Sequence, residues 1–187
     1  MGKKQKVVMG IFITLVILLV LVVGGYIFVK NTYPLHYEEE ILEYSQEFGL
    51  DPYFVAAVIW TESKFQANAE SSQGAIGLMQ IMPDTGNWIA EKLDMGEQDE
   101  DTLVDPDVNI RLGCWYLSYL MDKFDGDLTK VMAGYNAGPN RVEQWLQDPE
   151  YSSDGTSLET IPYEETENYV KRIQTSYKIY QFLYDLG

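Results

Sequence analysis

The chain opens with one long apolar segment and continues as shorter segments in which apolar and polar residues recur at helical spacing. Val7 to Val29 form 23 positions without a charge, rich in Ile, Leu and Val. A helix of this length measures roughly 35 Å at ~1.5 Å per residue, enough to cross a hydrocarbon core of ~30 Å. We therefore expect a basic tail over residues 1–6, a transmembrane helix over residues 7–29 and a linker over residues 30–36.

The rest of the chain, residues 37–187, is predicted to be one all-α domain. Capping residues, helix-starting prolines and helix-ending glycines delimit its apolar repeats. They predict helices over residues 37–48, 52–62, 83–93, 106–120, 127–135, 139–146 and 162–183. The acidic residues 94–102 and the polar residues 148–160 are expected to be loops. No run alternates with the two-residue period of a strand, and about 150 residues can bury a core.

Lysines set the expected orientation of the transmembrane helix. Lys3, Lys4 and Lys6 precede the span and only Lys30 follows it closely, so the positive-inside rule places the amino terminus in the cytoplasm and the domain outside. A cleaved signal peptide is the alternative. The apolar run is longer than the apolar region of such a peptide, and no small-residue cleavage site follows it, which favours an uncleaved anchor.

Acidic residues dominate the chain after the apolar segment. All 29 Asp and Glu follow residue 30, together with nine of the 13 Lys and Arg, which leaves this part with a net charge of −20. Binding to nucleic acid depends on cationic contacts to phosphates, so this composition argues against a nucleic-acid partner. A solvated, soluble surface is the favoured interpretation of the acidity.

The only cysteine, Cys114, and the only histidine, His36, narrow the chemistry further. A single cysteine cannot form an intramolecular disulfide, and a small buried residue is the favoured interpretation of Cys114. One His and one Cys argue against a Ser-His-Asp triad, a Cys-His pair and a His/Cys zinc site. We therefore expect no metal and no cofactor, and chemistry carried by carboxylates, amides and tyrosines.

Glu62 stands out because it closes an otherwise apolar run from Val55 to Thr61. Burial at the end of an apolar helix disfavours the charged carboxylate, and the dipole at a helix carboxyl terminus acts in the same direction. A carboxyl group that stays protonated near neutral pH is what a general acid needs. For an isolated glutamate, a solvated residue at a helix end would be the alternative.

Four ordered motifs resemble those of the soluble-type lytic transglycosylases. They are Glu62-Ser-x-Phe with Ser71 nine residues on, Gly-Ala-x-Gly-Leu-Met-Gln-x-Met-Pro over residues 74–83, Gly-Tyr-Asn-Ala-Gly over residues 134–138, and Ile-Pro-Tyr-Glu-Glu-Thr-x-x-Tyr-Val over residues 161–170. The resemblance covers residues 37–186 and implies a lysozyme-like helical fold. Ala67 replaces a common proline, and Gly86 and Gly134 replace common alanines, without loss of a reactive side chain. Gly134 is expected to loosen its helix, since Gly costs up to ~1 kcal/mol against Ala.

The resemblance implies a peptidoglycan lytic transglycosylase. Glu62 would protonate the leaving oxygen of the β-1,4 bond between N-acetylmuramic acid and N-acetylglucosamine. The same residue would then take the proton of the muramic acid C6 hydroxyl, which closes a 1,6-anhydro ring without water. The expected location is a bacterial cell membrane, single-pass, with the catalytic domain on the extracytoplasmic side. Expected partners are peptidoglycan glycan strands, the membrane, and cell-wall or secretion proteins.

The resemblance also implies six substrate-binding residues: Ser71, Gln80, Met82, Tyr135, Asn136 and Glu165. Ser71 would bond the acetamido or lactyl group, with a turn serine and the adjacent Ser72 as alternatives. Tyr135 would lie near the reacting sugar and orient Glu62, or be a buried structural residue. Asn136 would bind ligand or cap a helix. Glu165 would position substrate rather than serve as a second catalytic carboxylate.

Two glycines are expected to let the backbone come close to sugar, Gly74 and Gly77, although turn geometry alone would also explain them.

Three alternative functions remain open. A goose-type lysozyme would keep the fold and use water as the nucleophile. A non-catalytic glycan-binding scaffold of a cell-wall assembly is a second alternative, against which the intact Glu62 argues. The third is an integral-membrane protein that pairs through its helix, which is weakened by the absence of a Gly-x-x-x-Gly pattern in the span.

Overall fold

The computed structural model describes residues 2–187, which divide into two compact units after Pro34. The first unit contains α1 (Lys3–Thr32). Its apolar side chains are exposed on every side of the helix from Val8 to Phe28, a pattern typical of a membrane span. The stretch Val8–Thr32 is long and apolar enough to cross a membrane. The predicted apolar amino-terminal helix is therefore confirmed, and it continues three residues beyond the expected end at residue 29.

The second unit, Leu35–Gly187, contains helices and no strand among the described residues. Its helices are α2 (Glu38–Phe48), α3 (Pro52–Ser63), α4 (Pro83–Lys92), α5 (Glu100–Leu103), α6 (Pro106–Lys123), α7 (Leu128–Ala137), α8 (Pro139–Leu146) and α9 (Glu164–Leu183). The all-α fold class is confirmed.

Aspartate caps start three of these helices where the sequence predicted them. The side chains of Asp51, Asp105 and Asp127 accept hydrogen bonds from backbone N–H groups in the first turns of α3, α6 and α7. The expectation of a loop over residues 94–102 was wrong in part, because Asp99 caps the short helix α5 by accepting from the Thr102 N–H. The last helix begins at Glu164, two residues later than expected.

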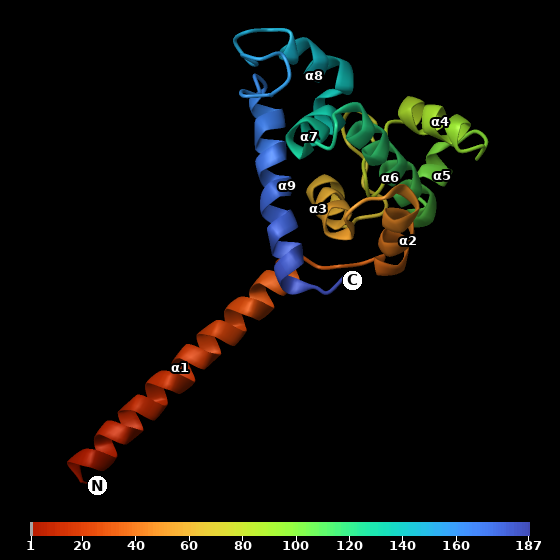
Figure 1. Ribbon diagram of the computed structural model, residues 1–187. Helices are drawn as coiled ribbons and strands as arrows, with labels where there is room; N and C mark the ends of the chain where they lie inside the picture. The colour runs from red at the N-terminus through yellow and green to blue at the C-terminus, as the bar shows by residue number, and fades with distance from the viewer. Residues whose placement is uncertain (1) are drawn as a thin grey trace. The chain divides into compact units, whose positions relative to one another are not determined.

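The centre of this unit is α3, whose residues Phe54 to Ile59 are all buried. Figure 1 shows α3 between α9 on one side and α2 and α6 on the other, and both α9 and α2 contact it. A helix that is apolar all round can be buried on all sides. At its carboxyl end α3 comes nearer to the surface, since Trp60, Thr61 and Glu62 are half-buried.

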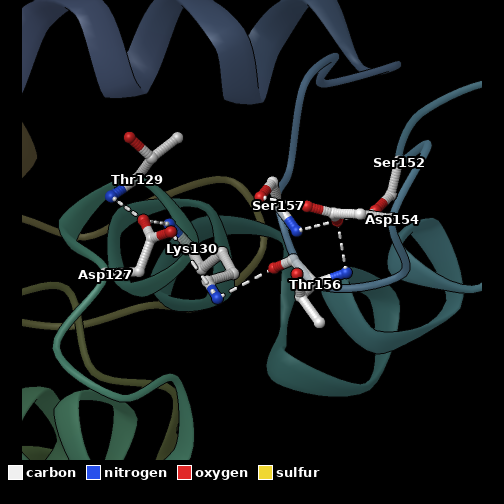
Figure 2. A network of polar contacts seen from close by, with 7 residues as sticks. All are labelled: Asp127, Thr129, Lys130, Ser152, Asp154, Thr156 and Ser157. Atoms are coloured by element: carbon white, nitrogen blue, oxygen red, sulfur yellow. Dashed lines mark hydrogen bonds and ion pairs between the residues drawn. The ribbon is translucent and has the colours of Figure 1, made fainter.

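The loop that joins α8 to α9 is ordered by polar contacts rather than by helix (Figure 2). The Asp154 carboxylate accepts hydrogen bonds from the backbone N–H groups of Ser157 at 2.6 Å and Thr156 at 2.7 Å. These bonds, led by that from Ser157, hold the pKa of Asp154 well below its usual range. Lys130 on α7 donates from Nζ to the Thr156 carbonyl at 3.0 Å. The loop is thereby tied to α7 before the chain enters α9.

Candidate active site

Glu62 lies in the last turn of α3, and the chain leaves the helix directly after it. Lys64 adopts a left-handed conformation with φ 55° and caps the helix by donating its N–H to the Trp60 carbonyl. Phe65 follows with φ 62° and buries its ring. Two successive left-handed residues turn the backbone sharply, so the carboxyl group of Glu62 stands where an apolar helix meets an irregular loop.

One hydrogen bond fixes the Glu62 carboxyl group. Tyr169, on α9, donates from its hydroxyl to Glu62 Oε1 at 2.6 Å. Burial raises the pKa of Glu62 to about 7, while the Tyr169 hydrogen bond and the charge of Arg172 act in the opposite direction. Arg172 is the only charged group in the described part of the chain that shifts this pKa. Glu62 is therefore divided between its acid and base forms near neutral pH, as an acid–base catalyst requires.

The hydroxyl group of Tyr135 is not bonded to Glu62 in this structure, and its orienting role stays a prediction. Tyr135 donates to the Met79 carbonyl at 2.8 Å, not to Glu62. It still lies within electrostatic reach of Glu62, whose charge adds to burial in raising the Tyr135 pKa well above its usual value. The residue that holds Glu62 is Tyr169, which the sequence analysis quoted within the fourth motif but did not assign to the site.

Asn109, also missed from the sequence, organises the glycine-rich loop. It is fully buried on α6, accepts from the Met79 N–H at 2.7 Å, and donates to the carbonyls of Ile76 at 3.0 Å and Leu103 at 2.7 Å. Gly77 has φ +82°, and a Cβ there would lie 2.3 Å from Asn109 Nδ2. Turn geometry and close packing therefore require a glycine here, and close approach of this backbone to sugar stays a prediction.

Ser71 and Gln80 each form hydrogen bonds to the backbone of the same loop. The Ser71 hydroxyl oxygen accepts from the Ala75 N–H at 2.9 Å and the Gln73 N–H at 3.3 Å, as the turn-serine alternative requires. Gln80 donates from Nε2 to the carbonyls of Ala69 and Gly77 at 3.1 and 3.0 Å. These bonds leave the hydroxyl proton of Ser71 and the amide oxygen of Gln80 available to a ligand.

Met82 is 42% exposed, which is uncommon for a large apolar side chain next to a buried core. Together with Gly74 it lines a surface hollow of about 250 Å³ beside the loop. Gly74 has φ +82°, and a Cβ there would meet nothing within 4 Å, so its turn is required but its surroundings are open. Neither Glu62 nor Tyr169 lines this hollow, and the binding role of Met82 stays a prediction.

Asn136 and Glu165 lie where α7 approaches the start of α9. Asn136 accepts a 2.8 Å hydrogen bond from the buried Thr166 hydroxyl at its Oδ1 atom, which ties the two helices together. Its remaining amide group is exposed. Glu165 is exposed in the first turn of α9, one helical turn before Tyr169. The structure thus places Glu165 on the helix that holds Glu62, at its solvent-facing end.

The site as a whole presents one carboxyl group of raised pKa among tyrosines, amides and backbone groups. Within residues 2–187, no three His, Cys, Asp or Glu side chains are grouped so that they could hold a metal ion. The carboxyl group of Glu62 can give a proton to a ligand atom and later accept one, because its protonated and ionised forms are both accessible near pH 7.

Comparison with known proteins identifies the fold. Residues 39–156 match the transglycosylase SLT domain family. The chain is 33% identical over 146 residues to the soluble lytic murein transglycosylase of Escherichia coli K12, covering 77% of this chain and 23% of that protein. It is 26% identical to membrane-bound lytic murein transglycosylase C of Cronobacter sakazakii, over 81% of this chain and 50% of the relative.

Among solved structures, the 70 kDa soluble lytic transglycosylase of E. coli superposes with a TM-score of 0.75 at 30% identity, over 82% of this chain and 25% of that one. The chain thus spans about a quarter of the length of these soluble relatives.

Proposed function

Because this chain belongs to the transglycosylase SLT domain family, we propose that it is a lytic transglycosylase that cleaves peptidoglycan at the β-1,4 bond between N-acetylmuramic acid and N-acetylglucosamine. The observation that carries the proposal is the single carboxyl group with a pKa of about 7, held by Tyr169 at 2.6 Å. The names of the similar proteins support the same substrate.

The first half-reaction uses Glu62 as an acid. Protonated Glu62 gives its proton to the glycosidic oxygen as the bond from that oxygen to C1 of muramic acid breaks, and an oxocarbenium-like centre develops at C1. The Tyr169 hydroxyl then stabilises the Glu62 carboxylate that has formed, because a hydrogen bond to the charged form favours that form.

The second half-reaction uses the same carboxylate as a base. Glu62 takes the proton of the C6 hydroxyl as that oxygen bonds to C1, which closes the 1,6-anhydro ring and restores protonated Glu62. Most glycosidases use two carboxylates. Among the described residues no carboxylate shifts the pKa of Glu62, which supports a mechanism with one. No water is consumed.

The substrate-binding roles belong to the same proposal. The hydroxyl of Ser71, the free amide oxygen of Gln80 and the exposed amide of Asn136 bond the sugar substituents. Met82 contacts a sugar face. Tyr135 lines the site beside Glu62, and Glu165 positions substrate from the start of α9.

We further propose that α1 anchors the enzyme, with a cytoplasmic tail over residues 1–6, a span over residues 7–29, a linker over residues 30–36 and the catalytic domain outside. The apolar surface of α1 and the similarity to a membrane-bound relative support an anchor, and the three lysines of the tail support the orientation.

Mass spectrometry of digested peptidoglycan tests the reaction. Purified protein should release muropeptides that end in 1,6-anhydro-muramic acid and contain no solvent oxygen when the digestion is run in ¹⁸O-labelled water. Reducing ends that carry the label would instead identify a goose-type lysozyme, and the absence of any product from folded protein would favour a glycan-binding scaffold.

A further inference from the structure

Tyr163 is an exposed aromatic residue close to the proposed site. Its side chain is 46% exposed, and among the described residues of the second unit only Met82 and Phe182 join it as exposed large apolar side chains. A single exposed ring is common on a protein surface, so its meaning depends on the side chains that surround it.

The ring of Tyr163 is held in place by two side chains of α8. Trp145, which is buried, packs edge-to-face against it with ring centroids 5.2 Å apart and planes at 80°. The Arg141 guanidinium carbon lies 5.7 Å from the Tyr163 ring centroid. A ring that is already fixed loses little conformational entropy when it binds a ligand.

Tyr163 also lies within reach of the proposed site. It is the N-cap of α9, and its carbonyl accepts from the Glu167 N–H at 2.9 Å. Tyr169 follows six residues later, which corresponds to roughly 9 Å along the helix axis. The intervening Thr166 bonds Asn136. Tyr163 thus lies near Glu165 and Asn136, two of the residues that are proposed to bind substrate.

Arg141 adds a charge that the rest of the domain does not neutralise. Its side chain is exposed, and it forms no ion pair with any described residue, although the chain after residue 30 carries 29 carboxylates. An exposed guanidinium next to an exposed aromatic ring matches a ligand that bears its own carboxylate.

We propose that Tyr163 and Arg141 form a substrate subsite, in which the ring of Tyr163 stacks on a sugar of the glycan strand and Arg141 pairs with a carboxylate of the peptide that the strand carries. The subsite rests on the proposed function. The C–H bonds on one face of a pyranose ring are weakly positive and meet the negative face of the aromatic ring. The two contacts together recognise a glycan that bears peptides.

The test measures binding to full-length protein in detergent, with Glu62→Gln as the background so that no probe is cleaved. The probes are the peptide-free tetramer of N-acetylglucosamine and a peptide-bearing tetrasaccharide muropeptide. Tyr163→Leu, which still covers Trp145 but has no flat ring, should weaken both probes about tenfold, an aromatic contact of ~1.4 kcal/mol. Tyr163→Phe should bind both normally.

Arg141→Gln should weaken the muropeptide several-fold and leave the tetramer unchanged, and Arg141→Lys should retain the preference for the muropeptide. The matched control is Phe182→Ala, which removes a ring that is 78% exposed on the same helix, roughly 28 Å further along its axis. It should change neither affinity.

Two results would overturn the subsite. Tyr163→Leu could bind both probes as tightly as Phe182→Ala does, or Arg141→Gln could weaken both probes equally, which would remove the role of the peptide carboxylate. Cleavage of peptidoglycan by the wild-type chain is measured in parallel. Normal cleavage with either result refutes the subsite alone, whereas no cleavage by folded wild-type protein refutes the proposed function.

Discussion

At the scale of single residues, the chemistry depends on the surroundings of Glu62. Burial raises its pKa to about 7, and Tyr169 limits that rise by donating to Oε1 at 2.6 Å. Burial supplies an acid at neutral pH, and the hydrogen bond keeps the conjugate base accessible, so one residue suits both half-reactions.

Replacing Glu62 by glutamine should remove most activity. The amide keeps the size of the side chain but cannot give its proton to the leaving oxygen, and general acid–base catalysis contributes ~10²–10⁴-fold. We expect a loss at the upper end of this range because one residue serves both steps. Turnover of peptidoglycan measures the loss, with Glu165→Gln as the matched carboxylate control, which should lose less. If folded Glu62→Gln stays active, or Glu165→Gln loses more, the roles assigned to these residues are wrong.

The same substitution should change the dependence of stability on pH. The Glu62 pKa is raised from an ordinary 4.5 to about 7, so between these values the folded state binds more protons than the unfolded state. The free energy of unfolding contributed by this group therefore falls as pH rises from about 4.5 to 7. Thermal melts should show Glu62→Gln gaining stability relative to wild type across this window. A constant difference from pH 4 to pH 8 would contradict the raised pKa.

Tyr169→Phe should shift the pH profile of activity. The acid form of Glu62 starts the reaction, so activity should decline as pH rises through about 7. Loss of the Tyr169 hydrogen bond removes an interaction that lowers the pKa, so the decline should move to higher pH, with a lower maximal rate. Tyr135→Phe, whose hydroxyl bonds Met79 instead, is the control and should leave the midpoint in place. An unmoved midpoint in Tyr169→Phe would mean that this bond does not tune Glu62.

At the scale of elements, close packing explains the two glycines that depart from the family pattern. In α4, a Cβ on Gly86 would lie 3.0 Å from Leu103 Cδ2. In α7, a Cβ on Gly134 would lie 2.8 Å from Cε2 of the buried Phe124 ring. The sequence predicted that Gly134 would loosen its helix. The structure adds the opposing reason for the glycine, since it makes room for Phe124.

Gly134→Ala should therefore destabilise the domain in spite of its better helix propensity. The gain of up to ~1 kcal/mol is opposed by overpacking that costs ~1–3 kcal/mol. We expect a net loss of about 1 kcal/mol in chemical denaturation. Adding Phe124→Leu should turn the effect of Gly134→Ala into a gain. If Gly134→Ala alone stabilises the protein, the Phe124 ring has room to move and the packing argument fails.

At the scale of the whole molecule, an apolar helix precedes an acidic helical domain. The helix α1 is long and apolar enough to cross a membrane, whereas the chain after residue 30 has a net charge of −20. The apolar surface and the acidic charge thus belong to two different units of the chain.

Protease added to intact spheroplasts should remove the domain and leave the anchor in the membrane. This outcome follows from the three lysines before the span and the positive-inside rule. Immunoblotting with tags at both ends would follow each fragment. As a control, the protease is added to permeabilised cells, in which it should cut the domain whichever side of the membrane the domain occupies. Full protection in spheroplasts would reverse the orientation, and a released form that begins near residue 25 or later would show that the span is cleaved.

The sequence by itself determined the features that are local in the chain. The apolar segment, the aspartate caps of α3, α6 and α7, the all-α class and the position of Glu62 depend on residues that are neighbours in sequence. The four residues of α5 are too few to show helical periodicity, so this helix was missed. Trp115 and Tyr119 on α6 are partly exposed, because helical spacing shows a shared face but not how completely that face is covered.

Only the tertiary structure decided which groups touch Glu62 and the loop beside it. Tyr169 lies 107 residues after Glu62 and reaches it because α9 packs along α3. Asn109 lies 30 residues after Met79 and fixes the glycine-rich loop from α6. Hydrogen bonds of this kind depend on the distance and direction between helices that pack against one another, and a pattern of residue types along one chain specifies neither.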